Sequence, residues 1–408
     1  MNFLKKYLDR VRPNFEEGGK LHAFHSVFDG FDTFLFTPST TSGAKGAHIH
    51  DAIDSKRTMI IVVAALMPCF FFGMYNTGYQ HQLALGLDKF PFWEMMLYGF
   101  LAIIPRVVVA YVVGLGIEFI VAQWRKEEIQ EGFLVTGILI PMILPIETPL
   151  WMIAVATAFS VIFVKEVFGG TGYNVLNVAL FTRAFLFFAY PAQMSGDKVF
   201  VATGTALGYG HAVPDGFTCA TPLGQIATQT SEHLTLTGVD GKILTTWDAF
   251  IGLIPGSFGE TSMLCILIGA AILLLSRIAD WRVMFSVFAG GLIMGWIANM
   301  CATPTYPASY LTPIDQLLYG GFAFAAVFMA TDPVTAARTT VGKYIYGFLI
   351  GVIAVIIRTY NNGYPEGAML AVLLMNCFAP PCQQLLRQFI QIGRFGSCAG
   401  RKAISRGA

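Results

Sequence analysis

Charged residues are scarce in this sequence: Asp, Glu, Lys and Arg together make up 12% of its 408 residues. Hydrophobic residues make up 55%, and the mean hydropathy is +0.61. A soluble globular domain carries about twice this share of charge, because its surface must be solvated. The composition therefore excludes an ordinary soluble protein and indicates an integral membrane protein.

Three further features are missing, and each excludes a class of site. The net charge is only +1 and the basic residues are scattered at the ends of apolar segments, so we expect no nucleic-acid partner. The seven cysteines form no CxxC pair, so we expect no metal or iron-sulfur cluster in this chain. No GxGxxG follows a predicted strand, and "FGGTGYN" fails the same test of context, so we expect no nucleotide-binding fold in this chain. The polar "HIHD" at residues 48–51 stays unassigned.

What the sequence does contain is a series of apolar segments. A helix needs about 20 apolar residues to cross the hydrocarbon core of a bilayer. The second segment is over-long and contains Pro105, where we expect a kink. The ten segments lie at residues 58–75, 93–124, 133–144, 149–165, 176–190, 261–275, 282–300, 318–330, 342–357 and 366–380.

The third and eighth segments are too short to cross as straight helices. They occupy matching places in two sets of five, and each opens a stretch of 60 residues that runs to a proline, residues 132–191 and 321–380. An odd number of spans forces two repeats into opposite orientations, a plan in which broken helices line a site near the bilayer midplane. We therefore predict an all-α integral membrane protein with two inverted five-segment repeats, an architecture similar to that of urea and ammonium channels.

The distribution of Lys and Arg predicts the orientation. With the N-terminus inside, the inner side carries 20 of the 26 basic residues and the outer loops carry three. The long loop that follows the fifth segment is therefore expected outside. The predicted domains are a cytoplasmic N-terminal arm (1–57), a first membrane repeat (58–190), a periplasmic loop (191–260), a second membrane repeat (261–380) and a cytoplasmic C-terminal tail (381–408).

The long loop contains the stretch "DGFTCATPLG" at residues 215–224. Its composition alone is typical of a turn. Its order resembles the flavinylation motif of the Na+-translocating NADH:quinone oxidoreductase and of the related Rnf complexes. In that family a flavin transferase joins the FMN phosphate to a threonine hydroxyl as a phosphoester.

The resemblance implies that Thr221 carries the covalent FMN, because it follows Ala220 as the acceptor follows alanine in the family. Asp215 and Thr218 are the other neighbours in the motif, and Thr218 is the rival hydroxyl. Cys219 stands where the family has glycine. Because the phosphoester must form inside a second enzyme's active site, we expect an exposed hydroxyl on a flexible turn.

The resemblance extends over nearly the whole chain. The strings "FEEGGK", "DSKRTMIIV", "EGFLVTGIL", "KEVFGGTGYN", "WDAFIGLIPGSFGE", "GGFAFAAVFMATDPV" and "YPEGAMLAVLLMNCFAP" occur in order. The chain is similar to the B subunit of the Na+-translocating NADH:quinone oxidoreductase, a relative of the D subunit of the Rnf complex. The N-terminal arm favours the former over the shorter-headed Rnf protein.

This resemblance implies a function, cofactors, partners and location. The family passes electrons from NADH through flavins and iron-sulfur centres to ubiquinone or menaquinone while it exports Na+. The chain is expected to hold covalent FMN, to be associated with noncovalent riboflavin and to contribute to the quinone site. It would lie in the bacterial inner membrane within a six-subunit complex, with the second FMN-bearing subunit and the NADH-oxidising FAD/2Fe-2S subunit as partners.

Two acids inside apolar segments match the family's Na+ route, Glu118 and Asp332. Intramembrane charges are costly unless they serve a pathway or a pair, and hard cations prefer oxygen ligands. Asp332 could instead be a turn residue before a proline, and Glu118 could pair with Arg106 or Arg183. The family also associates a glycine pair with quinone binding, of which only Gly114 is retained here; membrane glycines otherwise mark close helix packing.

Two acids outside this route, Glu166 and Glu366, are expected at the solvated surface. Two classes of function stay open from the residues. One is a redox subunit of an ion pump, either the Na+-translocating NADH:quinone oxidoreductase or the Rnf complex. The other is a channel or carrier with the same inverted repeats and no electron chemistry. The ordered family-like strings favour the pump.

Overall fold

The computed structural model describes residues 2–15, 28, 55–87, 91–125, 132–194, 200–214, 219–229, 234–361, 363 and 366–380. Within these ranges the chain is helical and forms no strand, only two isolated β-bridges. Four helices are long and apolar enough to cross a membrane: Lys56–Ala84, Phe92–Arg125, Trp281–Met300 and Thr340–Tyr360. The prediction of an all-α integral membrane protein is confirmed at this level.

Helices lie in all ten apolar segments. The two π-helical stretches, η3 and η5, each fall within one of these segments. In chain order the elements are α1 (Asn2–Val11), η1 (Arg12–Asn14), α3 (Ser55–Ala84), α4 (Phe92–Arg125), α5 (Phe133–Ile143), α6 (Leu150–Ser160), η3 (Val161–Glu166), α7 (Val178–Ala189), α8 (Pro191–Met194), α9 (Pro222–Thr228), α10 (Thr246–Ile251), α11 (Met263–Leu275), α12 (Trp281–Met300), η4 (Pro307–Tyr310), α13 (Pro313–Leu318), α14 (Phe322–Phe324), η5 (Ala325–Met329), α15 (Thr340–Tyr360) and a last helix, Ala368–Pro380.

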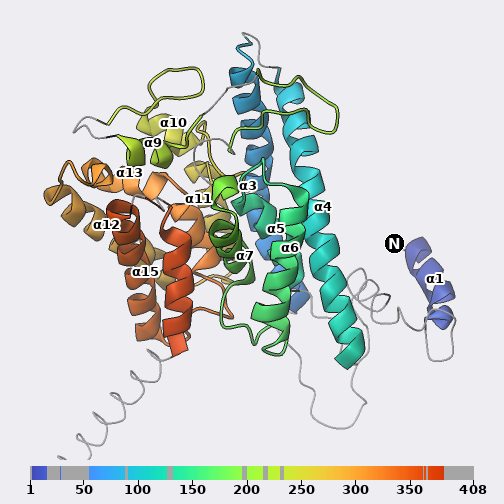
Figure 1. Ribbon diagram of the computed structural model, residues 1–408. Coiled ribbons are helices and arrows are strands. Elements are labelled where there is room, and N and C mark those ends of the chain that lie inside the picture. Colours follow the sequence, from blue (N-terminus) through green and yellow to red (C-terminus); the bar gives the residue numbers. More distant parts are fainter. Residues whose placement is uncertain are drawn as a thin grey trace, which may run out of the picture.

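Small residues set the closest helix packing. Helices α12 and α15 lie side by side in Figure 1, and a Cβ built on Gly351 would lie 2.2 Å from the carbonyl oxygen of Val287. Backbones that approach so closely gain dispersion contacts along their length, which matters where lipid is as apolar as the side chains. Helices α3 and α4 pack together on the other side of the molecule (Figure 1).

Helix α3 continues to Ala84, beyond the predicted end of its apolar segment at residue 75. Its added turns carry polar side chains that reach loop backbone. The Asn76 amide donates to the carbonyl oxygen of Ile254 at 3.0 Å, and Nδ1 of His81 lies 2.8 Å from the carbonyl oxygen of Ala202. The helix continues because the loops satisfy these buried groups.

The third and eighth segments are interrupted. Helix α5 ends at Ile143, and Leu144 takes an extended conformation. Between α13 and α14 the chain turns at Gly320 and Gly321, with φ of 66° and 67°, a region that side chains with a Cβ rarely adopt. By contrast, α4 continues as one helix through Pro105.

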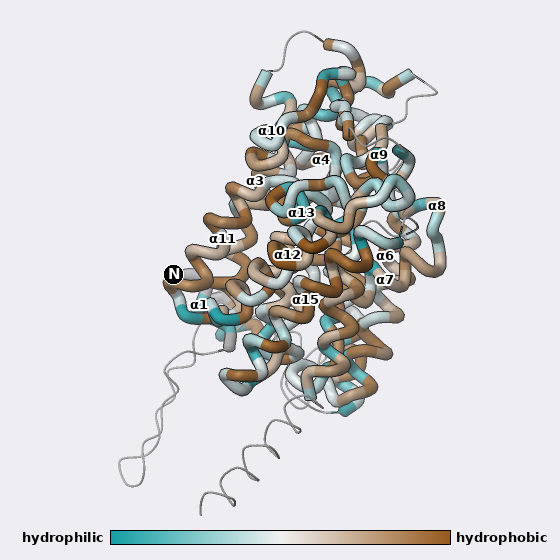
Figure 2. Tube along the Cα trace, turned by 90° about the vertical axis from the view of Figure 1, so that its left-hand side faces the viewer, coloured by the Kyte–Doolittle hydropathy of each residue, from teal (hydrophilic) through white to brown (hydrophobic). Residues whose placement is uncertain are grey.

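Two apolar cores are present among the described residues. The larger joins the long helices, and the smaller lies between α9, α10, η4 and α13 at one end of the bundle. Figure 2 shows hydrophobic residues along α11 and α15, with hydrophilic residues gathered toward the ends of the bundle. Met263 of α11 packs against the smaller core and so connects the short helices to the helix bundle.

Candidate functional site

Thr221 occupies the N-cap position of α9. Its Oγ1 accepts a hydrogen bond from the backbone N–H of Gly224 at 3.2 Å, and Pro222 begins the helix. The residue is 7% exposed. This differs from the predicted exposed hydroxyl, because the capping bond turns the side chain back onto its own helix.

The neighbours of Thr221 are held in the same turn. The Gln225 side chain donates to the carbonyl oxygen of Ala220 at 3.0 Å. Cys219 is buried, and burial raises the pKa of its thiol to about 11, so it stays protonated and weakly nucleophilic at neutral pH. Asp215 and Thr218 lie outside the described residues.

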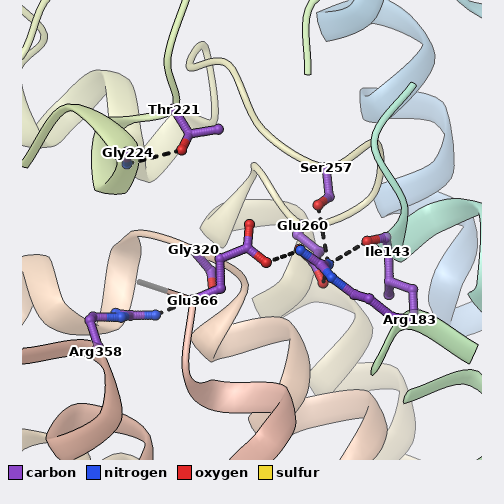
Figure 3. Close-up of polar contacts among 9 residues, drawn as sticks. All are labelled: Ile143, Arg183, Thr221, Gly224, Ser257, Glu260, Gly320, Arg358 and Glu366. Carbon is purple, nitrogen blue, oxygen red and sulfur yellow. Dashed lines mark hydrogen bonds and ion pairs between the residues drawn. The ribbon is translucent and has the colours of Figure 1, made fainter. Parts of the chain in front are cut away.

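A buried charge cluster lies beneath this turn (Figure 3). Arg183 of α7 is 2% exposed; its Nη1 lies 3.2 Å from Glu260 and 3.3 Å from the Ser257 hydroxyl, and its Nη2 pairs with Glu366. A cavity of about 20 Å³ separates the cluster from α9, with Thr221 on one wall and both glutamates on its lining. Glu366 is therefore not a free surface carboxylate as expected: it is half-buried and pairs with the buried Arg183.

Arg358 is the second buried guanidinium in this region (Figure 3). It lies at the end of α15 and donates to the carbonyl oxygens of Gln316 and, at 3.2 Å, of Gly320. The Gly320 carbonyl lies in the interrupted eighth segment and the Gln316 carbonyl lies just before it in α13, where the end of a helix leaves carbonyls without intrahelical partners. Arg358 thus stabilises the break.

A second candidate site lies toward the opposite end of the bundle, around Glu118. This carboxylate, on α4, is 5% exposed and forms an ion pair with Lys165 of η3, which is equally buried. The alternatives predicted from sequence, Arg106 and Arg183, are both engaged elsewhere: Arg106 donates to the carbonyl oxygen of Ala102. Beside the pair, Arg125 lies 3.7 Å from Glu166, so Glu166 is buried against a partner and is not solvated as expected.

Gly114 lies one helical turn from Glu118 and packs against α5. A Cβ at Gly114 would lie 1.8 Å from Cζ of Phe133, whereas a Cβ at Gly116 would meet nothing within 4 Å. Phe133 also lies 5.9 Å from the Lys165 ammonium, measured to the ring centroid. Phe133 thus lies between the Gly114 contact and the Lys165 ammonium, and Gly114 has the close-packing role expected of a membrane glycine.

Asp332 follows η5 and lines a cavity of about 110 Å³. Its carboxylate accepts from the Asn177 amide at 3.2 Å, the Thr335 hydroxyl at 3.1 Å and the backbone N–H of Val334 at 3.0 Å. No Lys, Arg or His of the described chain forms an ion pair with it. The other polar residues of the lining are Thr58, Thr136, Lys165, Thr171, Asn174 and Thr331.

The structure thus separates the sequence-predicted residues into two sites. Thr221 lies over the Arg183 cluster at the α9 end, while Glu118 and Asp332 are joined through Lys165, which pairs with the first and lines the cavity of the second. Sequence reasoning missed Lys165 as a partner, together with Asn177 and the cluster around Arg183. One sequence feature could have indicated Lys165: it is a basic residue at the end of an apolar segment.

Known proteins match this chain over most of its length. The model of the NQR2, RnfD, RnfE family matches residues 43–391. A protein from Ectopseudomonas mendocina, named as the B subunit of a Na(+)-translocating NADH-quinone reductase, is 42% identical over 400 residues, covering 92% of this chain and 95% of its own. Proteins of the same name from Chromohalobacter salexigens (42%) and Azotobacter vinelandii (41%) each cover 92% of this chain, and the match spans 92% and 95% of their own lengths.

Proposed function

The chain belongs to the NQR2, RnfD, RnfE family, and on that premise we propose that it is the membrane-embedded B subunit of a Na+-translocating NADH-quinone reductase. It carries FMN covalently at Thr221, passes electrons toward a quinone and takes part in Na+ export. The observation that carries this proposal is 42% identity over 92% of the chain to proteins of that name.

The acceptor role of Thr221 rests on its chemistry and place. Its hydroxyl is the oxygen that would join the FMN phosphate, and the neighbouring thiol of Cys219 stays protonated and does not compete. The cavity of about 20 Å³ beside Thr221 is too small for a flavin ring. The flavin therefore lies outside the α9 turn, and the Thr221 side chain leaves its capping bond when it is modified.

The residues around the Asp332 cavity suit a Na+ binding site. Carboxylate, amide and hydroxyl oxygens are the ligands of hard cations. A carboxylate with no basic partner in the described chain also needs a cation or a proton to balance it. About 110 Å³ accommodates an ion with several waters, each of which occupies about 30 Å³ in the liquid.

The remaining features follow from the same function. The described helices are compatible with two inverted five-segment repeats, in which the interrupted α5 and α14 regions hold matching places. The excess of basic residues supports a cytoplasmic N-terminus and a position of α9 on the periplasmic side of the inner membrane. Noncovalent riboflavin and the quinone bind to this chain together with its partner subunits. Gly114 is the candidate contact for the quinone.

The test is the intact mass of the chain after co-expression with the flavin transferase, followed by peptide mapping of residues 215–224. A mass increase equal to one FMN on Thr221 is the expected result. An unmodified chain would overturn the covalent-flavin proposal and leave the inverted-repeat channel or carrier. The purified complex should also reduce quinone with NADH faster when Na+ is added; an Rnf-type protein would not show this NADH-quinone activity.

A further inference from the structure

Lys165 lies on a widened turn of helix between two candidate acids. It belongs to the π-helical stretch η3, which continues α6, and Asp332 comes three residues after the other π-helical stretch, η5. Such turns have poorer hydrogen-bond geometry than α-helix and recur at functional sites. The protein therefore retains two costly backbone features where Lys165 and Asp332 line one cavity.

The charges around this cavity are unevenly distributed. The Lys165 ammonium and the Glu118 carboxylate pair with each other, while Asp332 has only hydrogen-bond donors. An ammonium and a Na+ ion compete for the same carboxylate, because both are compact cations attracted by its oxygens. A Lys stem is flexible and carries three donors, so its head can exchange one carboxylate for another.

We infer that Lys165 is a tethered cation that holds Glu118 when Na+ is absent and, when Na+ binds one of the two carboxylates, Glu118 or Asp332, pairs with the other. The inference rests on the proposed Na+ function. It adds a way for Na+ and the Lys165 ammonium to exchange places on the carboxylates. With Na+ bound, each carboxylate then has a cation; without Na+, Asp332 keeps only its three hydrogen-bond donors. Phe133, below the ammonium and against Gly114, limits the movement to the cavity side.

The first test is Lys165→Met, with the Na+ concentration for half-maximal quinone reduction as the readout. Removal of the tethered competitor should lower that concentration about fivefold or more, the low end of coupling between two binding events. Lys343→Met is the matched control: Lys343 also pairs with an acid, Asp280 at 2.6 Å, but lies outside the cavity. An unchanged or higher half-saturation in Lys165→Met, in a complex that assembles and carries flavin, would overturn the inference.

A second pair of variants keeps the test decisive if Lys165→Met fails to fold. Glu118→Gln leaves the ammonium free to hold Asp332 and should raise the Na+ requirement. Adding Lys165→Met to Glu118→Gln removes both buried charges, which restores charge balance, and should lower the requirement again. No recovery in the double variant would mean that Lys165 is only a structural partner.

Equilibrium binding of 22Na+ to the purified complex distinguishes failure of the proposed Na+ function from failure of the tethered-cation inference. If the unmodified complex binds no Na+ and shows no Na+ dependence, the proposed function fails. If it binds Na+ but Lys165→Met binds with the same affinity, only the tethered-cation inference fails.

Discussion

Thr221 and Thr312 have the same capping geometry, although Thr221 is buried and Thr312 is exposed, and this allows a controlled test of the flavin site. Each precedes a proline, caps a short helix and accepts from a backbone N–H at 3.2 Å. Thr221→Ala and Thr312→Ala should each cost about 1 kcal/mol of cap stability. Only Thr221→Ala should lose the fluorescent band of this chain on a denaturing gel. Retained fluorescence would move the acceptor to another residue, Thr218 first.

Asp332 lies in a polar cavity without a basic partner in the described chain, so its charge should matter to cation binding. A pair of unit charges 4 Å apart interacts by about 4 kcal/mol at an effective dielectric of 20. Asp332→Asn should therefore raise the Na+ concentration for half-maximal quinone reduction by about tenfold or more, with little change in NADH oxidation by an artificial acceptor. Asp315→Asn, in a capping turn at the α9 end, is the control. Equal Na+ dependence in the two variants would remove Asp332 from the ion path.

At the scale of elements, two glycines allow the close contact between α4 and α5: Gly114 faces Phe133, and Gly137 faces Tyr111. A Cβ at Gly114 overlaps the fully buried Phe133 ring, while a Cβ at Gly116 meets open space on the same helix. Gly114→Ala should destabilise the complex by about 1–3 kcal/mol through overpacking. Gly116→Ala should be neutral. Thermal unfolding of the detergent-solubilised complex measures both, and equal melting temperatures would contradict this account of the contact.

The same pair of variants also bears on the quinone hypothesis for Gly114. A packing defect lowers stability at every quinone concentration. A direct contact with quinone would instead raise the KM for quinone while the melting temperature stayed unchanged. The distance of the built Cβ from Phe133 favours the packing result.

At the scale of the molecule, Arg183 joins the two halves of the chain. It lies on α7 and pairs with Glu260, the last residue of the long loop, and with Glu366 in the second half. Loss of one partner leaves a buried carboxylate uncompensated, at a cost of about 3–5 kcal/mol. Arg183→Met should therefore sharply reduce the amount of assembled complex recovered by size-exclusion chromatography.

Lys242→Met provides the contrast for that experiment. Lys242 pairs with Asp240 at 2.9 Å, but its side chain is 84% exposed, and exposed ion pairs contribute little. Normal assembly of Lys242→Met beside failure of Arg183→Met would agree with the buried cluster as the link between the halves. Normal assembly of both would show that the apolar core alone joins them.

Sequence by itself determined the helical membrane character of this protein, the places of its apolar segments and the family to which it belongs. These depend on composition and on order along the chain, since runs of apolar residues can bury their backbone in a bilayer only as helices. The family-like strings likewise singled out Thr221, Glu118 and Asp332.

Only the tertiary structure decided how those residues are partnered. The pairs Lys165–Glu118, Asn177–Asp332 and Arg183–Glu366 join residues 47, 155 and 183 positions apart. No local periodicity encodes such contacts, because they depend on which helices pack side by side. For the same reason the burial of Thr221 and the ion pair of the half-buried Glu366, both expected at the surface, became visible only once the loops were folded against the helices.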